Sequence, residues 1–163
     1  FACICDPEST TAAIQAGPQA ELELTLGAKN DRLHGTPFTE RFRVLSIHDG
    51  KFTEPEARHG GFTQFDQGPT AIIETLDTDI TVMLTTRRMP PFSLAQLTSC
   101  GLDPNKFSII VAKGVIAPLA AYCPIAKSFI HVDTPGVTRA DIKKLSYSHR
   151  RKPMFPFENT SPR

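Results

Sequence analysis

The sequence has no long apolar run and no excess of charge of one sign. None of its apolar stretches approaches the ~20 residues that cross a bilayer, and no signal peptide is visible. The 163 residues include 18 Lys and Arg against 17 Asp and Glu, for a net charge of +1. Nucleic-acid and membrane-surface partners favour a clear basic excess. These absences argue against a membrane or nucleic-acid partner and favour a cytoplasmic protein.

Recurrent catalytic motifs are also absent. The sequence has no His-Glu-x-x-His, no Cys-x-x-Cys and no Gly-x-Gly-x-x-Gly. It has no Gly-x-Ser-x-Gly elbow for a serine nucleophile either. The few cysteines lie in apolar stretches, which predicts reduced and buried thiols: Cys3, Cys5, Cys100 and Cys123. Cys100 has no histidine close in sequence that would activate it as a nucleophile.

What is present predicts one folded domain. Hydrophobic residues make up 40% of the chain and charged residues 21%, as in ordinary globular domains. Residues 1–5 are apolar and predict a buried strand. Because the chain opens at Phe1 inside this strand, without a Met, we expect it to be a fragment whose upstream half is missing. Asp6, Pro7 and Glu8 then predict the start of a helix that ends at Gly17.

The remaining patterns predict an α/β fold of mixed α+β character. Residues 20–76 alternate as antiparallel strands do, with a bulge at Val44 and a hairpin formed by residues 70–76 and 80–86. From residue 80 the pattern is strand, helix, strand, helix. It gives buried strands at 107–112 and 129–132, helices from Ser93 to Gly101 and over 119–127, and a last helix that Thr138 and Asp141 open and that ends at Leu145. The prediction is a mixed sheet with crossover helices and an inserted antiparallel β layer.

Polar side chains follow four of the predicted core strands. They are Asp6, the pair Arg87 and Arg88, Lys113, and Asp133. In open α/β sheets, ligands bind at the carboxyl ends of the strands, so these residues would line one cleft rim if the strands are parallel. The alternatives are a helix cap for Asp6, a turn for Asp133 and solvated ion pairs for the arginines. Lys113 has the least reason to follow an apolar strand without a partner.

No complete metal site is predicted in this chain. Cys3 and Cys5 share a strand face, as do His131 and Asp133, so each pair offers two ligands where zinc needs three or four. Core packing explains the cysteines more simply. The basic cluster at 150–152 is followed by prolines and phenylalanines, which favours a tail that docks on its own protein over an anion or nucleic-acid site.

A series of short segments runs in order along the chain: Cys5-Asp6-Pro7-Glu8, Leu26-Gly27-Ala28-Lys29, His34-Gly35-Thr36-Pro37, Asp66-Gln67-Gly68-Pro69-Thr70-Ala71, Thr86-Arg87-Arg88, Gly101-Leu102-Asp103-Pro104, Ile110-Val111-Ala112-Lys113-Gly114, Tyr122-Cys123-Pro124-Ile125-Ala126, Val132-Asp133-Thr134-Pro135-Gly136-Val137 and Arg150-Arg151-Lys152-Pro153 with Pro156. Together these segments resemble the carboxy-terminal region of the MlrC (microcystinase C type) metallopeptidase family over nearly all of residues 1–163.

The resemblance implies a bacterial, metal-dependent hydrolase related to the enzymes that degrade linearised microcystin. It implies a zinc ion whose ligands lie in an upstream amino-terminal domain, outside this chain. The fragment alone would then be inactive, with no catalytic and no metal-binding residue of its own. Its partners would be that upstream domain and a peptide or small amide substrate, with a homo-oligomer as a further prediction.

One stretch departs from the family pattern. Where relatives have a histidine, an aromatic residue and an arginine after the Lys113 segment, this chain has Ala117, Pro118 and Leu119. The first function hypothesis is a hydrolase domain that contributes cleft walls, substrate contacts or an oligomer interface. In that hypothesis Arg87, Arg88, Lys113 and Asp133 are the candidate contacts with substrate or with the upstream domain. The alternative is a non-catalytic module for small-anion binding or for dimerisation.

Overall fold

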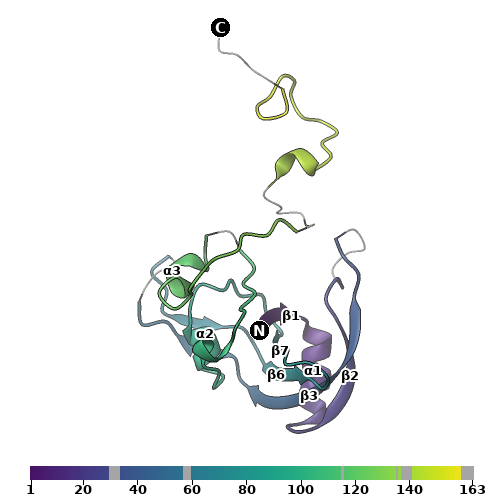
Figure 1. Cartoon of the computed structure of the whole chain (residues 1–163), viewed down its shortest axis with the longest axis vertical. Helices are drawn as coiled ribbons and strands as arrows, with labels where there is room; N and C mark the ends of the chain where they lie inside the picture. The colour runs from purple at the N-terminus through teal and green to yellow at the C-terminus, as the bar shows by residue number, and fades with distance from the viewer. Residues whose placement is uncertain (30–33, 57–59, 115, 135, 137–140, 159–163) are drawn as a thin grey trace. The chain divides into compact units, whose positions relative to one another are not determined.

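A computed structural model of the chain describes residues 1–29, 34–56, 60–114, 116–134, 136 and 141–158. It divides into two compact units, Phe1–Ile130 and His131–Arg163. The first unit holds both sheets and most of the helices (Figure 1).

A five-stranded mixed sheet forms the centre of the first unit. Its strand order is β1-β7-β6-β3-β2, from β1 (Ala2–Cys5), β7 (Thr81–Thr85), β6 (Thr70–Thr75), β3 (Phe38–His48) and β2 (Glu21–Leu26). β1 runs parallel to β7, and every other neighbouring pair is antiparallel. The predicted mixed α+β class is confirmed. Of the antiparallel strands predicted within residues 20–76, β2, β3 and β6 belong to this same sheet instead of forming a separate layer.

A second, two-stranded sheet pairs β4 (Lys51–Thr53) with β5 (Gln64–Asp66) in antiparallel register. The predicted bulge in β3 is present, because the register with β6 shifts between Val44 and Ser46. The hairpin of β6 and β7 is also confirmed, with Thr70 opposite Thr85 and Glu74 opposite Thr81.

Helix α1 (Pro7–Ala16) confirms the first predicted helix at both ends. The Asp6 side chain accepts a hydrogen bond from the Ser9 backbone N–H, Pro7 occupies the first helical position, and Gly17 is the C-cap. The helix packs on one face of the sheet, where Ala13 lies in a buried cluster with Phe42 and Val44 (Figure 1). This face is therefore closed to water beneath α1.

The opposite face of the sheet is covered by the chain that follows β7. Ile72 and Met83 point to that face and pack with Cys100. Leu97, from α2 (Ala95–Thr98), packs with residues of α3 (Leu119–Tyr122) in a neighbouring cluster. With both faces covered, β6 and β7 are buried along almost their whole length.

The helices after β7 are shorter than the sequence predicts. Of the helix predicted from Ser93 to Gly101, only α2 forms as an α-helix. The Ser93 hydroxyl, predicted as its cap, does accept a hydrogen bond from the Ala95 N–H at 3.0 Å. The helix predicted over 119–127 shrinks to α3. Between them lies a 3₁₀ helix, η1 (Pro104–Lys106).

The two buried strands predicted at 107–112 and 129–132 are wrong for this chain. In the first segment a single isolated bridge joins Val111 to Ala2, and in the second no strand forms. Ile109, Val111 and Ile130 are exposed instead of covered on both faces. Apolar side chains prefer burial, which is why the pattern predicted buried strands. Among the described residues, however, none covers these side chains.

The second unit contains little regular structure among its described residues. The predicted helix ending at Leu145 is the 3₁₀ helix η2 (Ile142–Lys144), and Asp141 caps it by accepting from the Lys143 N–H. Thr138, predicted as its cap, lies outside the described residues. In the tail predicted to dock on its own protein, Arg150 makes local contacts: it pairs with Glu158 and lies 4.5 Å from the Phe157 ring centroid. The docking itself stays a prediction. The hydrogen bond from Arg150 lowers the pKa of Glu158 to about 2.

Candidate functional site at the carboxyl ends of β1 and β7

The parallel strands β1 and β7 end side by side, and each is followed by polar residues. The Asp6 backbone N–H, just after β1, donates to the Thr85 carbonyl at the end of β7 at 3.0 Å. Thr86 and Arg87 continue from β7 at this same edge. The sequence predicted that Asp6 and Arg87 follow the carboxyl ends of neighbouring strands, and these two positions do lie at the same end of the sheet.

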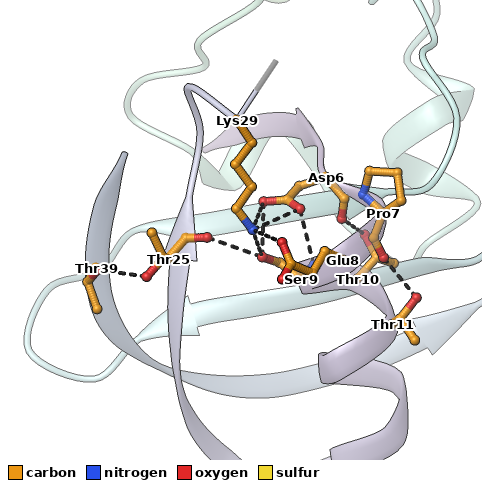
Figure 2. Close-up of polar contacts among 9 residues, drawn as sticks. All are labelled: Asp6, Pro7, Glu8, Ser9, Thr10, Thr11, Thr25, Lys29 and Thr39. Carbon is orange, nitrogen blue, oxygen red and sulfur yellow. Dashed lines mark hydrogen bonds and ion pairs between the residues drawn. The ribbon is translucent and has the colours of Figure 1, made fainter. Parts of the chain in front are cut away.

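Asp6 is the centre of a buried polar cluster that includes Lys29 (Figure 2). The Lys29 ammonium lies 2.9 Å from Asp6 Oδ2 and 3.1 Å from Asp6 Oδ1. It also donates to the Ser9 hydroxyl at 2.9 Å and to Glu8 at 3.1 Å. Because the Asp6 side chain is only 3% exposed and that of Lys29 30% exposed, the pair is held largely out of water. Sequence reasoning identified the Asp6 cap but not its cation.

A serine beside a lysine raises the question of nucleophilic catalysis. A lysine that acts as a general base must be neutral, and so needs a lowered pKa. Burial alone would lower the pKa of Lys29, but its hydrogen bonds to Asp6 and Glu8 outweigh burial and raise it. The Ser9 hydroxyl is engaged with Asp6 at 3.0 Å, and Ser9 is buried. The geometry therefore supports a structural tie between α1 and the chain after β2, and not a nucleophile.

A hollow of about 560 Å³ lies beside this cluster, within the size range of small-ligand sites. Both acidic residues that line the hollow, Glu8 and Glu23, are exposed. The Lys29 ammonium points to the carboxylates of Asp6 and Glu8. The residues that line it are Glu8, Ser9, Ala12, Glu23, Leu24, Thr25 and Lys29. None of them is a residue that the sequence singled out for substrate contact.

Arg87 contacts the last residue of β5 and the loop that follows it. Its guanidinium lies 2.6 Å from the Asp66 carboxylate, and its backbone N–H donates to the Gln67 carbonyl at 2.9 Å. Asp66 in turn accepts from the Gly68 N–H at 2.7 Å. An ion pair between exposed side chains contributes little to stability, ~0–1 kcal/mol. Its geometric effect is to fix the Asp66 turn against the end of β7.

The Thr86 hydroxyl is buried and has no hydrogen-bond partner among the described residues. Replacing it by a methyl group of similar size removes an unpaired polar atom, so we expect Thr86→Val to leave stability unchanged or to raise it by about 1 kcal/mol. The control is Thr85→Val, because the Thr85 hydroxyl donates to the Arg87 carbonyl at 3.0 Å. That variant should lose about 1 kcal/mol. Guanidinium unfolding compares the two, and equal losses would contradict the assignment.

The other candidate contacts stand apart from this edge cluster. Arg88 and Lys113 are exposed, and neither forms a hydrogen bond or ion pair with a residue that the structure describes. Val111, two residues before Lys113, forms a parallel bridge with Ala2, so the Lys113 segment runs in the same direction as β1. Asp133 lies in the second unit, where Lys144 is 3.3 Å from its carboxylate. Arg88 and Lys113 are therefore two exposed cations of the first unit that are available to another molecule, as are Lys51, Lys106 and Lys127.

The potential metal-binding side chains do not converge on one site among the described residues. Within the described residues, no group of three or more His, Cys, Asp or Glu side chains is placed to hold a metal ion. Burial and the neighbouring thiols of Cys5 and Cys100 raise the pKa of Cys3 to about 12, which disfavours the thiolate that zinc binds. Burial also raises the pKa of Cys100. These side chains do not fit a zinc centre.

The four cysteines are free, as predicted, but not all are buried. Cys100 is buried and Cys3 and Cys5 are partly buried, whereas Cys123 is exposed.

Residues 117–119, which depart from the family pattern, lie at the start of α3. Pro118 is buried at the start of α3, and Leu119 is the first residue of that helix. Among the described helices, none is long and apolar enough to cross a membrane.

Comparison with known proteins is informative at two levels. A family model described as MlrC C-terminus matches residues 1–149. Among solved structures, the chain is similar to one described as "Putative metallopeptidase" from Mesorhizobium sp. BNC1, with a TM-score of 0.81 and 23% sequence identity. The match covers 99% of this chain but 32% of that protein. At this identity the similarity establishes the fold alone. No curated protein matches the sequence.

Proposed function

The chain belongs to the MlrC C-terminus family, and on this premise we propose that it is the carboxy-terminal domain of a metal-dependent peptide or amide hydrolase. The observation that carries the proposal is the family match over residues 1–149. The similar structure from Mesorhizobium sp. BNC1, described as "Putative metallopeptidase", supports it through a shared fold. Since the chain covers 32% of that protein, the activity belongs to a longer polypeptide.

We place the metal, as zinc, outside this chain. The described residues supply no set of three ligands, and a catalytic zinc site needs three protein ligands with one open position. When bound, zinc would polarise the scissile carbonyl and activate water. No step of that chemistry is assigned to residues of this chain.

The role of this domain is to bind and to position. Arg88 and Lys113 are exposed cations without a described partner, so each is available to the carboxylate of a peptide or to an acidic group of the upstream domain. We assign Arg87 a positioning role, since it holds the Asp66 turn at the end of β7. Asp133 is proposed as a further contact from the second unit. A cytoplasmic location is part of the proposal, and the four free cysteines favour it.

The test uses the protein made from the complete reading frame. We expect about one zinc per subunit by elemental analysis, together with hydrolysis of linear peptides that a chelator abolishes. Arg88→Ala and Lys113→Ala should raise KM for peptides with a free carboxylate by roughly tenfold, the effect of losing one charge-assisted contact. The control is Arg41→Ala, on β3, where Arg41 already pairs with Glu21.

Two outcomes would count against the proposal. A complete protein that is metal-free and inactive would favour the alternative, a non-catalytic module for anion binding or assembly. An active enzyme in which Arg88→Ala and Arg41→Ala behave alike would keep the hydrolase but remove Arg88 from substrate binding.

A further inference from the structure

β1 is an edge strand of the five-stranded sheet, and its outer side has little backbone pairing among the described residues. On one side β1 pairs with β7 over its whole length. On the other side the backbone pairing is limited to residues 109–111: the Phe1 amine donates to the Ile109 carbonyl at 2.9 Å, and the Val111 N–H donates to the Phe1 carbonyl at 2.8 Å. Residues 109–111 thus begin a sixth, parallel strand that the described chain does not extend.

The outer side of this short strand has backbone groups that point away from β1. In a parallel ladder, alternate residues direct their N–H and C=O to opposite neighbours. Since Ile109 and Val111 bond to Phe1, the backbone groups of Ile110 face outward, and among the described residues they have no backbone partner. Such an edge accepts another strand readily.

The side chains around this edge are apolar and exposed. Ile109 is 73% exposed and Val111 62% exposed. Both belong to residues 107–112, whose apolar pattern is that of a strand buried on both faces. A monomeric soluble protein rarely leaves large apolar patches uncovered without a binding role. We define these residues, with the edge of 109–111, as the β1-edge surface.

The partner that covers this surface is inferred from the path of the polypeptide before Phe1. The family model that matches is that of a C-terminus, and the chain covers 32% of the similar structure. In a polypeptide that continues before Phe1, the preceding residues would leave the domain at this edge, because the Phe1 nitrogen lies 2.9 Å from Ile109. That nitrogen would then be a peptide N–H and would keep its hydrogen bond.

We infer that the β1-edge surface is the docking site for the preceding, amino-terminal part of the same polypeptide, which covers its apolar side chains and pairs with its free backbone edge. Lys113, exposed two residues beyond Val111, stands at the polar rim of this interface. The inference rests on the proposed function only in requiring a preceding domain, and it does not require a metal or an activity.

Hydrogen exchange of the complete polypeptide tests the inference without a substitution. We expect the Ile110 amide, whose N–H points away from β1, to exchange at least ~100-fold more slowly than the amides of the exposed 60–63 loop, as amides in a paired and covered strand do. The protection should not depend on protein concentration. Exchange as fast as in that loop would overturn the inference, and so would protection that appears only at concentrations where a dimer forms, which would assign the surface to a second copy.

Paired substitutions in the complete polypeptide give a second, independent measurement. Val111→Asp and Ile109→Asp should each lower the unfolding midpoint and abolish the protection of the Ile110 amide. The matched control is Phe62→Asp, since Phe62 is 69% exposed and lies outside the surface. Equal effects of all three variants would overturn the inference. A metal-free or inactive protein that still shows the protection would sink the proposed function and leave the interface standing, so the two failures are distinguishable.

Discussion

Replacement of Gly50 by alanine should remove a large part of the stability of the first unit. Gly50 has φ +75°, and an added Cβ would lie 1.9 Å from the Gly68 carbonyl oxygen and 2.8 Å from the Thr70 hydroxyl oxygen. The first of these atoms belongs to the backbone and cannot rotate away. The carbonyl of Gly50 also accepts from the Gln67 N–H at 3.0 Å, so the two loops cannot separate without losing this bond.

The matched control is Gly27→Ala. Gly27 has nearly the same φ, +73°, but an added Cβ would meet nothing within 4 Å. We expect a loss of about 1 kcal/mol there, the cost of a left-handed conformation. Gly50→Ala should lose about 4 kcal/mol, because steric overlap adds to the same backbone cost. Guanidinium unfolding of the chain, followed by far-ultraviolet circular dichroism, measures both. Similar losses would show that the loops of Gly50 and Gly68 move apart freely.

The contacts that local sequence determines were predictable. Helix α1 starts where Asp6, Pro7 and Glu8 predict it, because a cap and a proline act on the adjacent turn alone. The β6–β7 hairpin was also predictable, since its strands are joined by a short connection. In both cases the residues that decide the structure lie within a few positions of each other.

The strand predictions at 107–112 and 129–132 failed for a different physical reason. An apolar run indicates that its side chains prefer burial, but a strand also needs a neighbour whose backbone completes its hydrogen bonds. Residues 109–111 find one neighbour in Phe1, and their other side has no described partner. The inferred docking supplies the missing neighbour of residues 109–111, so that their apolar pattern describes the strand in the longer polypeptide.

The candidate site shows the same division. Arg87 and Asp6 were placed at one sheet edge from the strand pattern, and they lie there. The pairing of Asp6 with Lys29 was not predictable, because the two residues are 23 positions apart and meet through the fold. The family segments that contain them, Cys5-Asp6-Pro7-Glu8 and Leu26-Gly27-Ala28-Lys29, were the signal that could have suggested the contact.

Substitution of Lys29 by methionine should strongly destabilise the first unit. The variant keeps the aliphatic stem but leaves the Asp6 carboxylate, which is 3% exposed, without its cation. Breaking a fully buried pair by removing one partner costs about 3–5 kcal/mol. Here Asp6 keeps its bonds from the Ser9 N–H and hydroxyl, and Lys29 is itself partly exposed, so we expect a smaller loss of about 2 kcal/mol. The control Lys51→Met, at an exposed position of β4, should be nearly neutral.

A double variant separates the charge from the packing. Asp6→Asn keeps an N-cap side chain but removes the negative charge, so adding it to Lys29→Met should restore about 1 kcal/mol. If the ion pair contributed nothing, the two substitutions would simply add and the double variant would be the least stable. The raised pKa of Lys29 gives a further check: stability from the pair is fully present below the ordinary lysine pKa and is lost as pH rises through the higher folded value. Alkaline unfolding of the parent chain should therefore show a loss that Lys29→Met lacks.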